Sequence, residues 1–486
     1  MDKSLIRRFV FLTAMTKCLT IAMPLLANEL EQRTTLDDQI SVAVTIYNED
    51  LALIKDQRQV TLNKGLNHLA YRGVSAQIRP ETAMMRSLDA RTGFQVIEQN
   101  FDFDLLTPEK LLDHYVGREI SIATLNPASG EETIEQATVL STNGGTVIRV
   151  GDRIETNPRG RYIFDQLPDS LRDEPTLVTQ VMSPTSKPQT LELSYLSGGL
   201  SWKADYVAEL NADDQALDLL GWVTLDNKSG TQYKQAKLQL VAGDVNRVKE
   251  QFKHKNMRLE RSMVAAADMA EPMSEESLFE YHLYSLNRLT DIANNQTKQV
   301  SLLTASSVPV EKEFLLQGQD YYYRGSHHQL GQKLKVGVYV QFDNRKKTGL
   351  GMPLPKGIVR VYKRDQSSNA QFIGEDRIDH TPKNEKIRLK LGDAFDITAN
   401  RKQSSFAKRA ASKPFNYVFE AAYEIELKNT KTEAITVVVR EPIPGDWKML
   451  KENHTHQTIT AGISQWKINV PAEGSETLTY RVLVRY

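Results

Sequence analysis

The sequence is almost without cysteine, because Cys18 is the only one in 486 residues. A single thiol forms no intramolecular disulfide and offers no cluster of thiolates to a metal ion. Cys18 also lies within residues 1–27, whose removal we expect on the grounds given below. Thiol catalysis, thiol redox chemistry and thiolate-bound zinc are therefore excluded for the remaining chain.

The sequence also lacks a net charge, since 61 lysine and arginine residues balance 61 aspartate and glutamate residues. Residues 1–27 hold four of these bases and one of these acids, so the rest of the chain has a formal charge of −3. Proteins that bind the phosphate backbone concentrate positive charge. We therefore expect no nucleic-acid partner.

Long apolar runs are absent except at the start of the chain. Three basic residues within the first eight positions precede an apolar stretch, Phe9–Ala27, which Lys17 interrupts and which ends in small residues. This layout predicts a secretory signal peptide over residues 1–27. The alternative is an uncleaved membrane anchor, but spanning a bilayer needs about 20 uninterrupted apolar residues.

An export signal on a chain without disulfides is typical of a bacterial envelope compartment. We therefore expect an exported protein that is periplasmic or associated with the outer membrane, the latter as a peripheral protein.

The motifs of the common enzyme and cofactor classes are missing as well. The sequence contains no G-x-S-x-G, H-E-x-x-H, G-x-G-x-x-G or Walker A pattern. We therefore assign no catalytic, cofactor-binding or metal-binding residue, and we expect no cofactor.

Histidines were considered as metal ligands at two places. His454 and His456 lie on one face of an extended segment, with Glu452 close in sequence, but a third ligand would need an unusual turn. An exposed polar loop is the favoured interpretation. His327 and His328 are adjacent and point apart in a strand, so chelation by this pair is disfavoured.

Other polar and aromatic segments allow two interpretations each. The segment Tyr321–Arg324 is able to stack on a sugar or a base, although tyrosines on an alternating strand more often pack at a core edge. The acidic pairs Asp213–Asp214 and Asp102/Asp104 have no basic or metal partner nearby in the sequence. The Gly- and Pro-rich stretch Gly349–Gly357 predicts a structural crossover at a strand edge.

The apolar pattern predicts β-structure over most of the chain. Segments such as Val42–Ile46 and Leu191–Tyr195 alternate apolar and polar residues, and turn signals such as Asn63–Gly65, which predicts a hairpin, separate them. The basic segment Arg401–Lys413 predicts a loop. With 40% apolar residues, the chain is long enough for two to four domains.

We therefore expect a mainly β protein of tandem β-sandwich, immunoglobulin-like domains, with a small SH3/Sm-like barrel in the N-terminal third. Two hairpins that each end in an asparagine, Trp222–Asn227 and Tyr423–Asn429, suggest two copies of one sandwich, although chance similarity is nearly as good an explanation. The expected domains are residues 28–107, a small unit over 108–168 that begins with a helix over Glu109–Tyr115, a sandwich over 176–320 with a mobile insert at 248–277, and a sandwich over 321–486.

Four separated motifs then occur in order, with two short segments after the third. They are Ser197–Tyr206, Leu225–Gly243, Gly349–Tyr362 (followed by Phe372–Asp376 and Leu391–Asp393) and Glu441–Trp447. Together they resemble the bacterial family called "domain of unknown function 4139", over roughly residues 176–486. The resemblance implies an exported or envelope-associated β-rich protein and carries no catalytic residues over to this chain.

The leading hypothesis is a non-enzymatic cell-envelope binding or scaffold protein that engages an envelope protein or a glycan. Exposed sheet edges and the insert are the expected contact surfaces. The competing hypothesis is a hydrolase that acts on an envelope polymer through an interdomain carboxylate or metal site. Binding of nucleic acid by the small unit ranks last, because its charge is mixed and export would separate it from nucleic acid.

Overall fold

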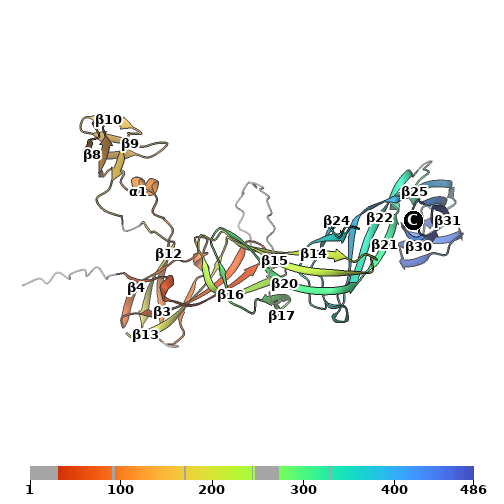
Figure 1. The fold of residues 1–486 in the computed structure, drawn as a ribbon, viewed down its shortest axis with the longest axis horizontal. Helices are drawn as coiled ribbons and strands as arrows, with labels where there is room; N and C mark the ends of the chain where they lie inside the picture. The colour runs from red at the N-terminus through yellow and green to blue at the C-terminus, as the bar shows by residue number, and fades with distance from the viewer. Residues whose placement is uncertain are drawn as a thin grey trace, which may run out of the picture.

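The computed structural model describes residues 31–486, except 90–92, 128, 169–170, 244, 247–272 and 328–329. The expected signal peptide with Cys18, and most of the expected insert at 248–277, lie outside the described residues. The protein is elongated (Figure 1) and mainly β, with 63% of residues in strands and 5% in helices. The predicted mainly β, sandwich-like fold class is confirmed, but no sheet of the described residues closes into a barrel, and the expected SH3/Sm-like barrel is an open five-stranded sheet. Among the described residues, no helix is both long and apolar enough to cross a membrane.

Two sheets form the first part of the molecule. One has the order β1-β4-β12-β6, with β1 at Gln32–Thr34, β4 at Gly65–Arg72, β12 at Thr176–Ser183 and β6 at Gln95–Asp102. The other has the order β17-β18-β16-β2-β3-β13-β5, with β19 also paired to β16. Its strands are β17 Ser274–Leu278, β18 Tyr281–Ser285, β16 Tyr233–Ala242, β2 Gln39–Tyr47, β3 Leu51–Thr61, β13 Pro188–Ser197, β5 Met84–Ser87 and β19 Thr290–Ile292.

The hairpin predicted at Asn63–Gly65 is wrong, because this turn leads the chain from one of these sheets to the other. β3 pairs with β2 and β13, whereas β4 pairs with β1 and β12. The Asn67 side chain holds the turn by accepting a hydrogen bond from the backbone N–H of Asn63 at 2.7 Å. Sequence spacing correctly indicated a turn but not whether the strands on either side pair.

The small unit begins with α1, Pro108–His114, at the predicted place. Thr107 caps this helix, since its hydroxyl accepts from the backbone N–H of Lys110, and Pro108 occupies the first turn. Five antiparallel strands follow in the order β10-β9-β8-β7-β11: β10 Arg153–Thr156, β9 Val147–Val150, β8 Glu132–Ser141, β7 Glu119–Leu125 and β11 Arg161–Ile163.

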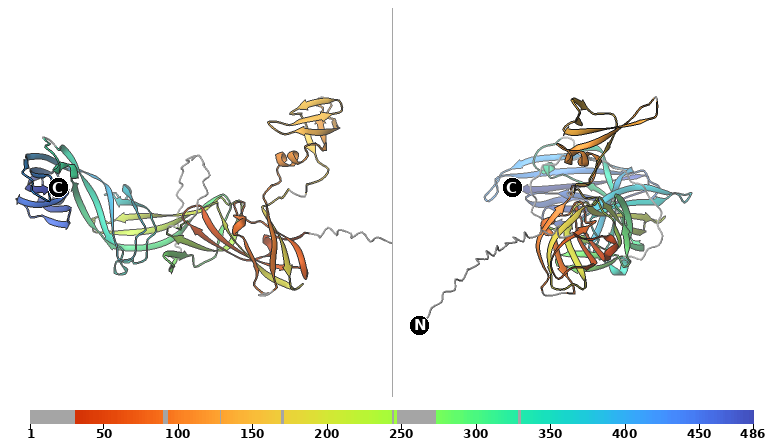
Figure 2. Two further views of the ribbon diagram at one scale, coloured as in Figure 1. Left: turned by 180° about the vertical axis from the view of Figure 1, so that it is seen from behind. Right: turned by 90° about the vertical axis from the view of Figure 1, so that its left-hand side faces the viewer.

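The small unit has its own core and stands off the rest of the molecule in both views of Figure 2. It is inserted between β6 and β12, two neighbouring strands of one sheet. The sheets of the first part therefore run across the boundaries that we expected at residues 107 and 176.

The middle of the molecule is built on a five-stranded sheet of order β20-β15-β14-β23-β24. Its strands are β20 Gln296–Pro309, β15 Ala216–Asn227, β14 Leu200–Leu210, β23 Gly357–Arg364 and β24 Ala370–Ile378. One continuous apolar core joins this sheet to the first part and to the beginning of the C-terminal strands, which contribute Val340 and Leu389.

The C-terminal strands pair in the order β28-β31-β26-β25-β22-β21-β27-β30-β29. They are β28 Asp446–Glu452, β31 Gly474–Arg485, β26 Val418–Asn429, β25 Lys386–Arg409, β22 Gly331–Asp343, β21 Glu311–Gln317, β27 Ile435–Pro442, β30 Ile463–Val470 and β29 Gln457–Thr460. A second large core, which includes Phe314 and Trp466, fills this sandwich and crosses the boundary expected at residue 321. Short 3-10 helices in the described parts of the chain are η1 Leu36–Asp38, η2 Pro80–Thr82, η3 Asp320–Tyr323 and η4 Lys346–Thr348.

The loop predicted over Arg401–Lys413 is wrong for residues up to Arg409, because these residues belong to β25. The whole strand is 24 residues long. This part of β25 pairs with β26 from Ile397 to Arg409. Its charges are compatible with a strand because most of them point to solvent, while Arg401 is buried with a partner.

The two asparagines of the suspected internal echo have the same hydrogen bonds. Asn227 donates to the carbonyl of Thr231 at 2.9 Å and accepts from the N–H of Ser229 at 3.0 Å. Asn429 donates to the carbonyl of Glu433, four residues ahead, at 2.8 Å and accepts from the N–H two residues ahead at 3.0 Å. Each side chain therefore closes the same turn.

The strands around these two turns pair in the same way. β15 is antiparallel to β14 and β20, as β26 is to β25 and β31. After the asparagine, β16 is parallel to β2 and antiparallel to β18, as β27 is parallel to β21 and antiparallel to β30. The two sandwiches are thus built on one repeated topology.

Candidate functional site

The two histidines considered as metal ligands form separate pairs with different acids. His454 Nε2 lies 3.2 Å from Glu476 Oε1, whereas His456 Nδ1 lies 3.0 Å from Glu452 Oε2. The same Glu452 oxygen accepts a hydrogen bond from the indole N–H of Trp466 at 3.0 Å. Within the described parts of the chain, no group of three potential metal-ligating side chains occurs.

The acidic pairs do have basic partners, contrary to the sequence-based expectation. Asp214 contacts the ammonium groups of Lys312 and Lys363, at 2.8 and 2.5 Å. Likewise, Arg172 contacts Asp102, and His114 contacts Asp104. The partners of Asp214 are 98 and 149 residues away in the sequence, which is why no local pattern revealed them.

The tyrosine segment belongs to the helix η3 and not to an alternating strand. Tyr322 and Tyr323 are buried, and the Tyr323 hydroxyl donates to Glu441 Oε2 at 2.9 Å. Tyr321 is 50% exposed, with its ring against Tyr322. Two of the three tyrosines therefore pack in the core, and one faces solvent.

An exposed aromatic surface lies where β25 ends, β26 begins and β31 ends. We call Phe406, Tyr417, Phe419 and Tyr486 the aromatic face. The Phe419 ring lies 5.4 Å from Phe406, 6.2 Å from Tyr417 and 5.9 Å from Tyr486, measured between ring centroids. Tyr417 is 51% exposed and the other three rings are half-buried.

Strand register explains why these rings gather at one place. Lys408 pairs with Phe419, and Phe419 pairs with Val484 on the other side. Phe406 and Phe419 continue the rows of inward-pointing residues on β25 and β26, but they lie at the open end of the core. The rings are therefore fixed by their strands and still accessible at their outer edges.

Two basic side chains, Lys408 and Arg324, lie beside the aromatic face. The Lys408 Nζ lies 5.3 Å from the Tyr417 ring centroid, and the Arg485 guanidinium lies 5.2 Å from the Phe415 ring centroid, both in cation–π contacts. Burial raises the pKa of the Tyr486 hydroxyl, and the nearby guanidinium of Arg324 opposes this shift.

Two cations and one acid have contacts that place them at the aromatic face, which gives a net charge of +1. Lys408 lies at Tyr417, and Arg324, which is paired with Asp320, lies near Tyr486. Glu420 follows Phe419 on β26, so it lies on the opposite face of the sheet with its partners Arg409 and Arg481. Hydrogen bonds from these two arginines hold the pKa of Glu420 below its ordinary value, although desolvation acts against them.

Sequence reasoning missed the aromatic face because its members come from three separate strands. The available signals were the exposed Tyr417 and the basic run at 401–413, and the run was interpreted as a loop. Trp202 and Trp466 are buried, while Trp222 and Trp447 are half-buried.

The fold and the aromatic face define a tandem β-sandwich protein with an accessible aromatic and basic surface on its second sandwich. The family model for the Domain of unknown function (DUF4139) matches residues 191–486. That match covers more than half of the chain, so the chain belongs to this family and the predicted resemblance is confirmed. A comparison with curated proteins found no match.

The first and third of the motifs that carried the resemblance meet at the middle sheet. The Tyr206 hydroxyl, from the first motif, donates to the carbonyl of Pro355, from the third, at 2.8 Å. A side chain at Gly357 would lie 2.4 Å from the carbonyl oxygen of Ala204, so only glycine allows β23 to pair with β14 there. These motif residues are explained by packing and need no role in chemistry.

Proposed function

We propose that this chain is a non-enzymatic binding protein of the cell envelope, and that its aromatic face binds an acidic glycan. The observation that carries the proposal is the row of accessible rings with a net charge of +1 beside it. The C–H faces of sugar rings pack well on aromatic rings. The tyrosines among these rings also offer hydroxyl groups for hydrogen bonds. Lysine and arginine side chains complement the carboxylates of an acidic polymer.

Binding is favoured over hydrolysis by the state of Glu420, the acid that follows Phe419 on β26. A glycosidase needs a general acid whose pKa is raised, so that the group is protonated when substrate binds. Two arginines lower the pKa of Glu420, which favours a permanent carboxylate. Glu420 also lies on the face of the sheet opposite the rings, where it pairs with Arg409 and Arg481. The competing hydrolase hypothesis would require a different pair of acids.

An exported location, periplasmic or outer-membrane associated, fits this proposal, because acidic polysaccharides are envelope components. The sequence of residues 1–27 supports export. An envelope protein is the alternative partner, and it would use exposed strand edges such as β6.

The test is titration calorimetry of the purified protein with a polyuronate such as alginate, with neutral dextran as the comparison polymer. We expect the polyuronate to bind and Tyr417→Ala to weaken binding about tenfold, as the loss of about 1.4 kcal/mol of ring contact predicts. The matched control is Phe395→Ala, which removes a 95% exposed ring of β25, the strand that carries Phe406, at a position outside the face.

Equal affinity of Tyr417→Ala and the unaltered protein would contradict the proposal, and so would equal binding of dextran. Formation of new reducing ends during incubation with the polyuronate would support the hydrolase instead.

A further inference from the structure

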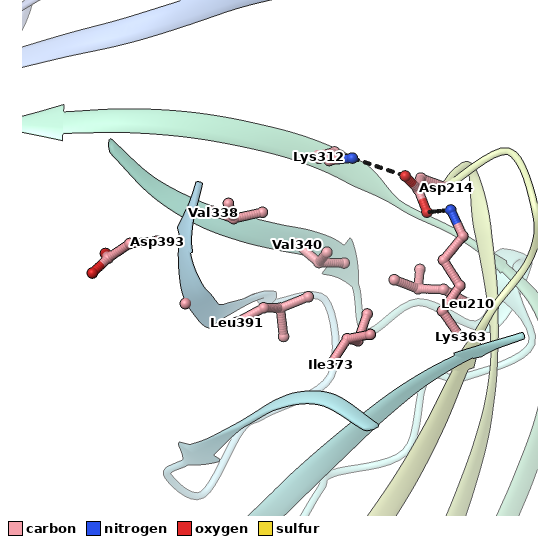
Figure 3. Close-up of a pocket in the computed structure, with 10 residues that line it drawn as sticks. Leu210, Asp214, Lys312, Val338, Val340, Lys363, Ile373, Leu391 and Asp393 are labelled. Carbon is pink, nitrogen blue, oxygen red and sulfur yellow. Dashed lines mark hydrogen bonds and ion pairs between the residues drawn. The ribbon is translucent and has the colours of Figure 1, made fainter. Parts of the chain in front are cut away.

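A second candidate site lies between the middle sheet and the C-terminal strands, away from the aromatic face. It is a pocket of about 280 Å³, which we call the intersheet pocket. Its floor is apolar, and the side chains that form it are Leu210, Val338, Val340, Ile373 and Leu391. They come from four different strands, and Figure 3 shows them between Asp214 at one end and Asp393 at the other.

Two lysines share one carboxylate at the end of the pocket marked by Asp214. Lys312 comes from β21 and Lys363 from β23, and both ammonium groups contact Asp214, as Figure 3 shows. Their side chains are 32% and 30% exposed, so they line the rim of the pocket and remain accessible to solvent. Each ammonium group has three donors, and one from each lysine suffices for the two contacts with Asp214. This end of the pocket therefore has a net charge of +1 and ammonium N–H donors that the contacts with Asp214 do not use.

The turn that carries Asp214 is fixed independently of the lysines. Asn211 Oδ1 accepts from the backbone N–H groups of Gln215 and Ala216, and Asp214 itself has a left-handed backbone, with φ of +58°. The N–H of Val310 also donates to the carbonyl of Gln215 at 2.9 Å, which ties the turn to the start of β21. The carboxylate is therefore held in place as the strands hold the two lysines.

An apolar floor with a positive end is complementary to a small molecule with an anionic head and a short apolar tail. Pockets for drug-sized ligands begin at about 300 Å³, so the ligand of this pocket is small. We propose that the intersheet pocket binds a small amphiphilic anion, whose carboxylate or phosphate head contacts Lys312 and Lys363 and whose tail packs on Leu210, Val340 and Leu391. This inference does not rest on the glycan proposal, because the two sites share no residue.

The experiment is calorimetric titration of the full chain with octanoate and with octyl phosphate, which distinguishes the two possible heads. Acetate lacks the tail and octylammonium has the opposite charge, so both serve as comparison ligands. We expect at least one of the two octyl anions to bind and neither comparison ligand to do so.

Three variants test the geometry. Asp214→Asn removes the carboxylate that competes for the lysines, so the affinity for the anion should rise roughly tenfold, and Lys312→Met should lower it by a similar factor. Leu391→Trp fills the pocket and should abolish binding, whereas Phe395→Ala, on the same strand but outside the pocket, should leave it unchanged. Circular dichroism checks that each variant is folded.

The proposal is overturned if folded Leu391→Trp binds as well as the unaltered protein. It is also overturned if octylammonium binds as tightly as octanoate, or if Asp214→Asn is folded and binds the anion more weakly.

Discussion

Arg401 and Glu441 form an ion pair in which neither side chain has any exposed surface. The guanidinium of Arg401 donates to one oxygen of Glu441, and the hydroxyl of Tyr323 donates to the other at 2.9 Å. A side chain at Gly318 would collide with this carboxylate, so the glycine leaves the space that the pair occupies. The pair connects β25 to β27 through the interior of the second sandwich.

Removal of one partner of this pair should destabilise the protein strongly. Glu441→Ala leaves the guanidinium of Arg401 buried without a counter-charge, which costs about 3–5 kcal/mol in comparable buried pairs. Urea denaturation followed by circular dichroism measures the change. The matched control is Lys402→Ala, which breaks the exposed pair with Glu424 and should cost about 1 kcal/mol or less. Similar losses for the two variants would contradict the role given to the buried pair.

The two equivalent asparagines should contribute similarly to stability. Asn227→Ala and Asn429→Ala each leave buried backbone groups of one turn without a partner, which costs about 1–3 kcal/mol. The same denaturation experiment checks this, with the exposed Asn416→Ala as control. A large cost at one position and none at the other would show that the two turns are only superficially alike.

The stability of the first sandwich should depend on pH through Glu192. Burial acts most strongly and would raise the pKa of this carboxyl, but hydrogen bonds from Gln57 and Arg86 outweigh it and lower the pKa below 4.5. A carboxyl whose pKa is lower in the folded state stabilises the protein above its unfolded pKa, and this stabilisation disappears as the pH falls through the folded value.

Between about pH 5 and pH 3, the free energy of unfolding should therefore fall more steeply for the unaltered protein than for Glu192→Gln. Urea denaturation across this pH range measures the two slopes. Equal slopes for Glu192→Gln and the unaltered protein would rule out this source of acid sensitivity.

What the sequence predicted correctly depended on neighbours in the chain. Thr107 and Pro108 predicted the helix of the small unit, and alternation predicted strands such as β13. Both signals act over a few residues. The spacing that revealed the turn at Asn63–Gly65 had no information on which strands pair, and the predicted hairpin was wrong for this reason.

What the sequence did not predict depends on distant contacts. Arg401 is compatible with a strand only because Glu441, 40 residues later, neutralises it in the core. Lys312 and Lys363 meet Asp214 because β21, β23 and the turn after β14 converge, and no pattern in the sequence encodes that convergence. Candidate sites made of side chains from several strands were therefore out of reach of local pattern analysis.

Binding of an acidic glycan to the aromatic face should weaken as salt is added. The charges around the face are exposed, and the Debye length falls from about 10 Å at 0.1 M salt to about 3 Å at 1 M, so the attraction between face and polymer is screened. Titrations of the polyuronate at several salt concentrations give the slope of log Kd against log salt concentration.

Lys408→Ala removes one charge from this attraction and should make the slope shallower. Tyr417→Ala removes a ring and no charge, so it should weaken binding at every salt concentration and leave the slope unchanged. Identical slopes for Lys408→Ala and the unaltered protein would mean that the polymer binds elsewhere.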